Sequence, residues 1–217
     1  DATGIGVVMN SGPPAALLPF KIVGSASFPY NNVDASFVPT LFPTAASYDS
    51  IRGNAFDSLL VSGTIPTSYT LPKGYPWIAG LLGVADGTTF TIAPGAGIAF
   101  SSQMFSVGGR LYSVGTLTDT IVLKARDPSA PFDGIKFQAA TLTDTSFVTL
   151  TRIEDTKPQT NVSTGGVWAT PNRAPVIIDS TVIRRSRKSA VFFQGVGSVI
   201  SRSIIDTAGL DSAGAAG

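Results

Sequence analysis

The sequence predicts an all-β fold in which short strands wind around one axis and stack coil upon coil. Three observations predict it. The composition is β-type and is interrupted by 23 glycines and 15 prolines. Short runs alternate apolar and polar residues, and these runs recur every 22 or 23 residues. One such coil cannot bury its inward face alone, but a second coil stacked about 4.8 Å away pairs its strands in parallel and continues the apolar column.

The composition permits a folded core and excludes several classes of function. The chain has 217 residues, of which 43% are hydrophobic, enough for one domain with a sizeable core. A net charge of +1 leaves no strongly basic surface for nucleic acid. Cysteine and histidine are absent, which excludes disulfides, thiolate metal sites and histidine-based catalysis or zinc binding. We therefore expect no metal and no cofactor.

Runs with the pattern apolar–x–apolar mark the predicted strands. They lie at residues 90–92, 98–100, 105–107, 121–123, 135–137 and 148–150. A period of two is typical of a strand with one buried face. Convincing helical periodicity over about twelve residues is absent from the sequence, in keeping with the frequent glycines and prolines.

The spacing of these runs predicts the stacking. Three pairs of apolar residues are 23 positions apart: Val84 and Val107, Ile98 and Ile121, and Phe100 and Leu123. We therefore expect Ile98 to lie under Ile121 and Phe100 under Leu123. A repeat of about 20–25 residues with several short strands indicates one turn of a solenoid. An antiparallel sandwich with evenly spaced strands is the alternative.

The repeat returns near the C-terminal end, where polar residues recur as well as apolar ones. Residues 178–183 read IDSTVI and residues 200–205 read ISRSII, a step of 22. In this alignment Asp179 corresponds to Ser201, and Arg184 corresponds to Asp206. The alignment predicts a solvent-facing charge pair between Arg184 and Asp206, of a kind that contributes roughly 0–1 kcal/mol.

The chain divides into three predicted parts. Residues 1–48 are an irregular Pro-rich segment or insertion, residues 49–210 form the coils with a loop insertion at about 155–175, and residues 211–217 are a flexible tail. The longest apolar run, residues 78–85, is too short to span a bilayer. Asp1 is not preceded by a signal segment, so we expect a processed mature chain or part of a longer protein.

A resemblance supports and refines this prediction. Residues 89–100 read TFTIAPGAGIAF and are followed by VGGRL at 107–111, GT at 115–116, IVL at 121–123 and FDGIKF at 132–137. This block resembles a recurring segment of large bacterial exported proteins with the pectin-lyase-like right-handed parallel β-helix. Typical members have Trp where Phe132 stands and an acidic residue where Ala93 stands. The resemblance implies a right-handed β-helix, secreted or on the cell surface, and leaves open adhesins, S-layer-like proteins, enzymes and polymer-binding modules.

Two groups of residues are candidates for ligand binding. Arg184, Arg185, Arg187 and Lys188 form the concentrated basic stretch of the sequence, which suits an acidic glycan, a lipid headgroup or a phosphate. The simpler interpretation of this stretch is a solvated turn at the edge of a coil. Trp168 follows a Gly-Gly pair and is a candidate for sugar stacking, or else an anchor that holds its loop against the body.

The sequence therefore favours a non-catalytic structural or adhesive scaffold of an exported cell-surface or filament-forming protein. Its partners are expected to be further copies, flanking coils of a longer parent chain, or a glycan or cell-envelope polymer. No catalytic residue is assigned. The alternative is a carbohydrate-active enzyme of the polysaccharide lyase type, or a glycan-binding module, acting on an acidic polysaccharide. Lyases of the resembled fold use arginine as a base with calcium-binding carboxylates, for which Asp179, Arg202 and Asp206 are the further candidates.

Overall fold

The structure is a computed structural model that describes residues 31–41, 44, 48, 59–75, 77–141, 143–157, 165–194 and 197–209. The predicted tail at 211–217, most of the predicted N-terminal segment and the middle of the predicted loop at 155–175 lie outside these residues. The described part of the N-terminal segment contains β1 (Asn31–Asp34), the 3-10 helix η1 (Ala35–Phe37) and the short helix α1 (Val38–Leu41).

The remaining described elements are all strands. In chain order they are β2 (Leu59–Ile65), β3 (Tyr69–Leu71), β4 (Trp77–Val84), β5 (Thr89–Ile92), β6 (Gly97–Phe100), β7 (Phe105–Val107), β8 (Arg110–Val114), β9 (Ile121–Ala125), β10 (Ile135–Phe137), β11 (Ser146–Thr149), β12 (Thr151–Glu154), β13 (Val167–Ala169), β14 (Val176–Asp179), β15 (Val182–Ser186), β16 (Val191–Phe193), β17 (Val199–Ser201) and β18 (Ile204–Ala208).

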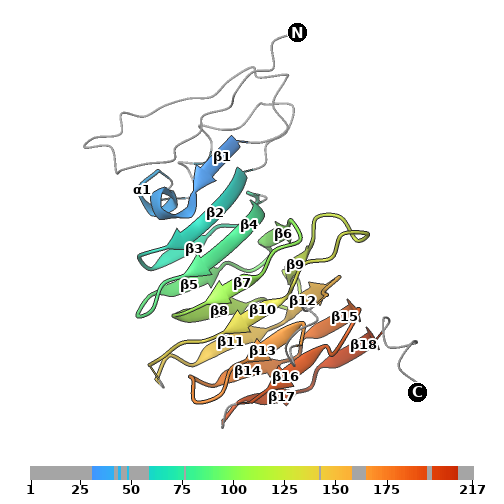
Figure 1. The fold of residues 1–217 in the computed structure, drawn as a ribbon. Coiled ribbons are helices and arrows are strands. Elements are labelled where there is room, and N and C mark those ends of the chain that lie inside the picture. Colours follow the sequence, from blue (N-terminus) through green and yellow to red (C-terminus); the bar gives the residue numbers. More distant parts are fainter. Residues whose placement is uncertain are drawn as a thin grey trace.

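The strands form three parallel ladders that run side by side along the molecule (Figure 1). One ladder is β2–β4–β6–β9–β12–β15–β18, the second is β4–β7–β10–β13–β16, and the third is β3–β5–β8–β11–β14–β17. Strand β4 belongs to two ladders because Trp77 pairs with β6 while Leu82 pairs with β7. Every pairing between these strands is parallel, which makes the predicted alternative of an antiparallel sandwich wrong. The architecture is all-β, with curled parallel sheets in a solenoid-like arrangement.

The observed register confirms two of the predicted steps. Val84 pairs with Val107, 23 residues away. At the C-terminal end Ile178 pairs with Ile200 and Arg184 pairs with Asp206, both with the predicted step of 22. The apolar spacing in these two regions therefore measures one coil directly.

One predicted step is wrong by two residues. Ile98 pairs with Leu123 rather than Ile121, and Phe100 pairs with Ala125 rather than Leu123. The corner between the third and first ladders explains the difference, because it is six residues long in one coil (Ile92 to Ile98) and ten in the next, from Ser113 to Leu123. The extra residues form a turn that the backbone amide of Thr116 closes on the carbonyl of Asp119, at 3.1 Å.

The core is a stack of inward-facing apolar side chains. On the first ladder Leu59, Trp77, Ile98, Leu123, Ile153 and Ile183 occupy successive rungs and are all at most 1% exposed. Aromatic rings extend the stack: Phe90 lies 5.7 Å from Trp77, and Phe100 lies 4.6 Å from Phe132. Each such side chain contributes about 1.5–3 kcal/mol on burial, so the column holds the coils together.

One corner recurs with the same backbone conformation in three successive coils. Leu150, Ser180 and Arg202 all have positive φ, at 46°, 48° and 47°. The following residue is Thr151, Thr181 or Ser203, and each hydroxyl donates to a backbone carbonyl near the corner. A tight left-handed turn capped by a hydroxyl joins the third ladder to the first.

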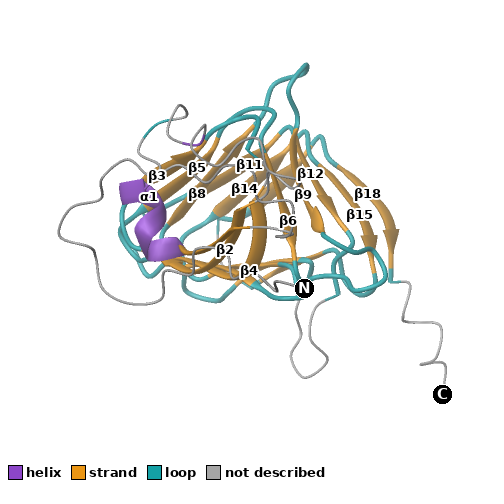
Figure 2. Cartoon of the chain, turned by 90° about the horizontal axis from the view of Figure 1, so that it is seen from above, coloured by secondary structure: helices purple, strands orange, loops and turns teal. Residues whose placement is uncertain are grey.

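The two ends of the described structure differ. At the N-terminal end β1 pairs with β2, and Ala35, Val38 and Tyr48 are buried in the core (Figure 2 shows α1 beside this end). At the C-terminal end β16, β17 and β18 each pair with only one strand among the described residues. The apolar core is covered at the first end and open at the second.

Candidate functional site

Charged residues of alternating sign line the outer face of the first ladder. Lys124, Glu154, Arg184 and Asp206 stand opposite one another on successive strands. Neighbouring parallel strands are about 4.8 Å apart, so each charge lies beside one of opposite sign. This arrangement lowers the electrostatic cost of stacking charged coils.

A network of three arginines surrounds two carboxylates in this ladder. Nη2 of Arg184 and Nε of Arg152 lie 2.8 Å and 2.7 Å from Oε1 of Glu154. Arg185 donates to Oε2 of Glu154 at 2.8 Å. Arg185 also makes a two-point contact with Asp155, at 2.6 and 2.9 Å. The side chains of Glu154 and Asp155 are each only 5% exposed, so the arginines neutralise two nearly buried charges.

The backbone brings these groups together. Asp155 and Arg185 each follow the first-ladder strand of their coil and each have positive φ, at 62° and 54°. The amide of Asp155 donates to the carbonyl of Arg184 at 3.2 Å. Hydrogen bonds to Asp155, and then to Glu154, raise the pKa of Arg185 against the lowering effect of burial. The guanidinium therefore remains charged and paired.

The predicted basic stretch is divided by this network. Arg184 and Arg185 face Glu154 and Asp155, whereas Nη2 of Arg187 donates to the carbonyl of Ser129 at 3.4 Å. Lys188 has no ion-pair partner among the residues described here. The predicted charge pair of Arg184 with Asp206 is wrong, because the guanidinium turns toward Glu154 of the preceding coil although Asp206 is in register with it.

Trp168 lies in strand β13, between Lys136 and Phe192 on the neighbouring strands. Its place in a flexible loop is therefore a wrong prediction. The ring nitrogen donates to Oε1 of Gln194 at 3.1 Å, and Nζ of Lys136 lies 4.6 Å from the ring centroid. The cation and the amide hold the indole against the sheet. Sugar stacking on this ring stays a prediction.

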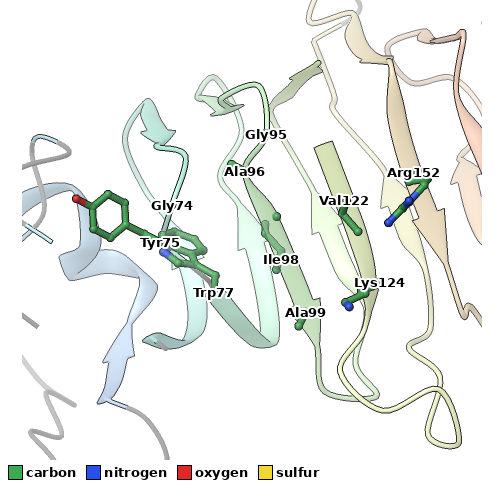
Figure 3. Close-up of a pocket in the computed structure, with 11 residues that line it drawn as sticks. Gly74, Tyr75, Trp77, Gly95, Ala96, Ile98, Ala99, Val122, Lys124 and Arg152 are labelled. Atoms are coloured by element: carbon green, nitrogen blue, oxygen red, sulfur yellow. The ribbon is translucent and has the colours of Figure 1, made fainter. Parts of the chain in front are cut away.

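A shallow pocket of about 420 Å³ lies on the outer face of β6. Its floor is made of small residues, including Gly97 and Ala99, with Tyr75 at one end and Lys124 and Arg152 at the other (Figure 3). A side chain in place of Gly97 would lie 3.0 Å from the carbonyl of Val122. The hollow therefore depends on small residues at this strand, and two cations reach its wall.

The other lyase candidates form a pair that links the last two coils. Arg202 donates from Nε to Oδ1 of Asp179 at 2.8 Å, and its Nη2 contacts Oδ2. Ser201 donates to the same carboxylate at 2.8 Å. Hydrogen bonds from Arg202 and Ser201 lower the pKa of Asp179 to about 2. This carboxylate is ionised and engaged in structure.

Two further searches cover the described residues. No three or more Asp or Glu side chains there cluster in a way that could hold a metal ion. None of the helices described is long and apolar enough to cross a membrane. Comparison of the chain with protein-family models, with curated proteins and with solved structures found no match. The candidate sites therefore rest on geometry alone.

Arg152, Glu154 and Asp155 are functional candidates that the sequence analysis missed. Glu154 and Arg184 pair across 30 residues, a longer step than the 22 or 23 residues of the regular coils. The basic stretch was visible in the sequence, but its acidic partners lie one coil away. An alignment that allowed a longer coil between residues 150 and 180 would have placed Glu154 beside Arg184.

Proposed function

We propose that this chain is a segment of right-handed parallel β-helix that serves as a non-catalytic structural or adhesive scaffold of an exported cell-surface or filament-forming protein. The observation that carries the proposal is the open apolar end of the stack. Ile205 is 49% exposed and Ile200 is 39% exposed, although both point inward. Their equivalents in the preceding coil, Ile183 and Ile178, are completely buried.

The open end is suited to further stacking. Strands β16, β17 and β18 present free backbone amides and carbonyls on all three ladders, and such edges pair readily with other strands. Covering the exposed isoleucines would bury apolar surface at about 25 cal/mol per Å². Solenoids require a cap or a further coil at this position. A neighbouring copy or a flanking coil of a longer parent chain satisfies that requirement.

The charge ladder supports the same proposal. Lys124, Glu154 and Arg184 each have a neighbour of opposite sign on both sides or within the network described above, whereas Asp206 ends the series. A stacked coil that places a basic residue over Asp206 continues the alternation. We expect the natural partner of this end to carry such a residue.

Sedimentation velocity of the purified chain over a range of concentrations tests the scaffold proposal. We expect concentration-dependent self-association, and we expect Ile205→Lys to shift the chain toward monomer because it places a charge in the exposed core. Leu117→Lys is the matched control, since Leu117 is 89% exposed in a corner away from this end. A chain that stays monomeric at high concentration, or variants that associate equally, would contradict the proposal.

The second candidate function is binding or cleavage of an acidic polysaccharide. The observation that favours it is the pocket on β6, where Lys124 and Arg152 stand beside Tyr75. Incubation with polygalacturonate or alginate, with and without calcium, separates the two. Release of unsaturated products would replace the scaffold proposal with a lyase. Retention on the polymer that disappears in Lys124→Ser, without products, would indicate a glycan-binding module.

A further inference from the structure

The outer face of the third ladder carries a straight column of uncharged residues. The register places one outward-facing residue from each strand in line: Thr70, Thr91, Tyr112, Phe147, Ile177 and Val199. The residues on either side of Tyr112, Leu111 and Ser113, are completely buried. The column therefore lies on the outside of the sheet, and we call it the outer stripe.

The outer stripe has an apolar part with an aromatic pair. The rings of Tyr112 and Phe147 lie 5.3 Å apart at an angle of 53°. Tyr112 is 40% exposed and Val199 is 47% exposed. The hydroxyl of Tyr112 has no hydrogen-bond partner among the described residues. An exposed aromatic ring with a free hydroxyl offers both an apolar face and a polar edge.

The other part of the outer stripe is lined by hydroxyl groups. Thr70 and Thr91 belong to a hollow of about 370 Å³ that Thr89, Ser68 and Pro39 also line. The hydroxyl of Ser68 already accepts the amide of Thr89 at 3.0 Å. The threonines can donate to and accept from a ligand. The hollow continues the line of the aromatic pair because Thr91 is in register with Tyr112.

Charge is absent from the outer stripe and is neutralised beside it. Arg110 lies on the same strand as Tyr112, but its Nη2 donates to the carbonyl of Thr143 at 3.0 Å and lies 3.6 Å from a carboxylate oxygen of Asp144. An anionic ligand gains little from such a guanidinium. The chemistry of the stripe favours a neutral ligand with both C–H faces and hydroxyl groups.

We propose that the outer stripe binds a neutral, extended β-linked polysaccharide that lies along the axis of the stack. The six residues are spaced by one strand separation each, about 4.8 Å, so they form a straight track across the strands. An extended β-linked glycan presents flat C–H faces to the aromatic pair and its hydroxyl groups to the threonines. The proposal goes beyond the scaffold function, because it assigns a ligand to a face that coil stacking leaves free.

Retention of the full chain on microcrystalline cellulose and on chitin tests this proposal. We expect retention that persists at high salt, because no charge takes part, and at least a tenfold loss of affinity in Tyr112→Ala. Leu117→Ala is the matched control, since this equally exposed-type apolar side chain lies outside the stripe. Circular dichroism of each variant verifies that the fold is retained.

The outcomes separate this proposal from the scaffold proposal. Ile205→Lys should abolish coil stacking without changing retention on cellulose or chitin. Failure of the wild-type chain to bind either polymer, or equal binding by Tyr112→Ala, overturns the ligand assignment and leaves the scaffold proposal intact. A change of sedimentation in Tyr112→Ala without a change of retention would show that the stripe contacts another protein copy, and would also overturn it.

Discussion

Arg185 and Asp155 are 30 residues apart in the chain and form a two-point ion pair between neighbouring coils, with both residues at equivalent left-handed corners. The pair is tied to Glu154, which Arg184 and Arg152 also approach. Because the two carboxylates are nearly buried, the arginines stabilise the stack at a point where unpaired charge would be costly. The basic stretch of the sequence thus has a structural part and a free part.

Arg185→Ala should destabilise the fold by about 1.5–3 kcal/mol, since it leaves charge-assisted hydrogen bonds to Asp155 and Glu154 unmade. Urea unfolding followed by circular dichroism measures the change. Arg187→Ala is the control, because the Arg187 side chain makes one long contact with the Ser129 carbonyl and should cost less than about 0.5 kcal/mol. Equal effects of the two substitutions would refute a special role for Arg185.

Asp179 should make stability sensitive to acid. Its pKa is lowered to about 2 in the folded chain, below the value of about 3.9 in an unfolded chain. The stabilisation is therefore fully present above about pH 4 and is lost as the pH falls toward 2. Urea midpoints measured between pH 5 and pH 2 should fall more steeply for the wild-type chain than for Asp179→Asn. Parallel pH profiles would show that this carboxylate is not the source.

Tyr48→Phe should weaken the attachment of the N-terminal cap. The Tyr48 hydroxyl lies 2.6 Å from that of Tyr69 and accepts the indole N–H of Trp77 at 3.2 Å. Its removal leaves buried polar groups without this partner, at a cost of about 1–3 kcal/mol. Thermal unfolding measures the loss, and a shift in tryptophan emission reports on Trp77. Tyr112→Phe, which removes an exposed hydroxyl, should change stability by less than about 0.5 kcal/mol.

Gly109→Ala should be far more damaging than Gly87→Ala. A Cβ at Gly109 would lie 2.3 Å and 2.4 Å from the carbonyl oxygens of Thr88 and Ala85, which the backbone cannot easily move. Gly87 has a φ of 71° but no atom within 4 Å of a Cβ, so alanine there costs about 1–2 kcal/mol for the left-handed conformation alone. Denaturant midpoints of both variants test the ranking. A smaller loss in Gly109→Ala would mean that this corner is looser than its contacts indicate.

The sequence predicted the strands and the period because both depend on local alternation. Inward positions such as Ile98 and Phe100 are identified by a period of two, which any half-buried strand shows. The step from Val84 to Val107 was correct because the corners of those two coils match in length. The resemblance added handedness and location, which remain proposals.

The register at Ile98 was beyond the sequence pattern. A shift of two residues keeps every side chain on its own face of the sheet, so steps of 23 and 25 bury equally apolar residues. Only the geometry of the ten-residue corner before Leu123, closed by Thr116 and Asp119, selects the longer step. The error in the predicted partner of Ile98 follows from this degeneracy.

The sequence by itself determined that short strands coil and stack, because their alternation and spacing are properties of neighbouring residues along the chain. The tertiary structure alone decided which charges meet, as when Arg184 turns to Glu154 rather than to Asp206. It also decided that Tyr112 and Phe147 share one exposed column. Such contacts depend on the exact length of each coil, and corners of different length realign whole strands without altering the apolar pattern.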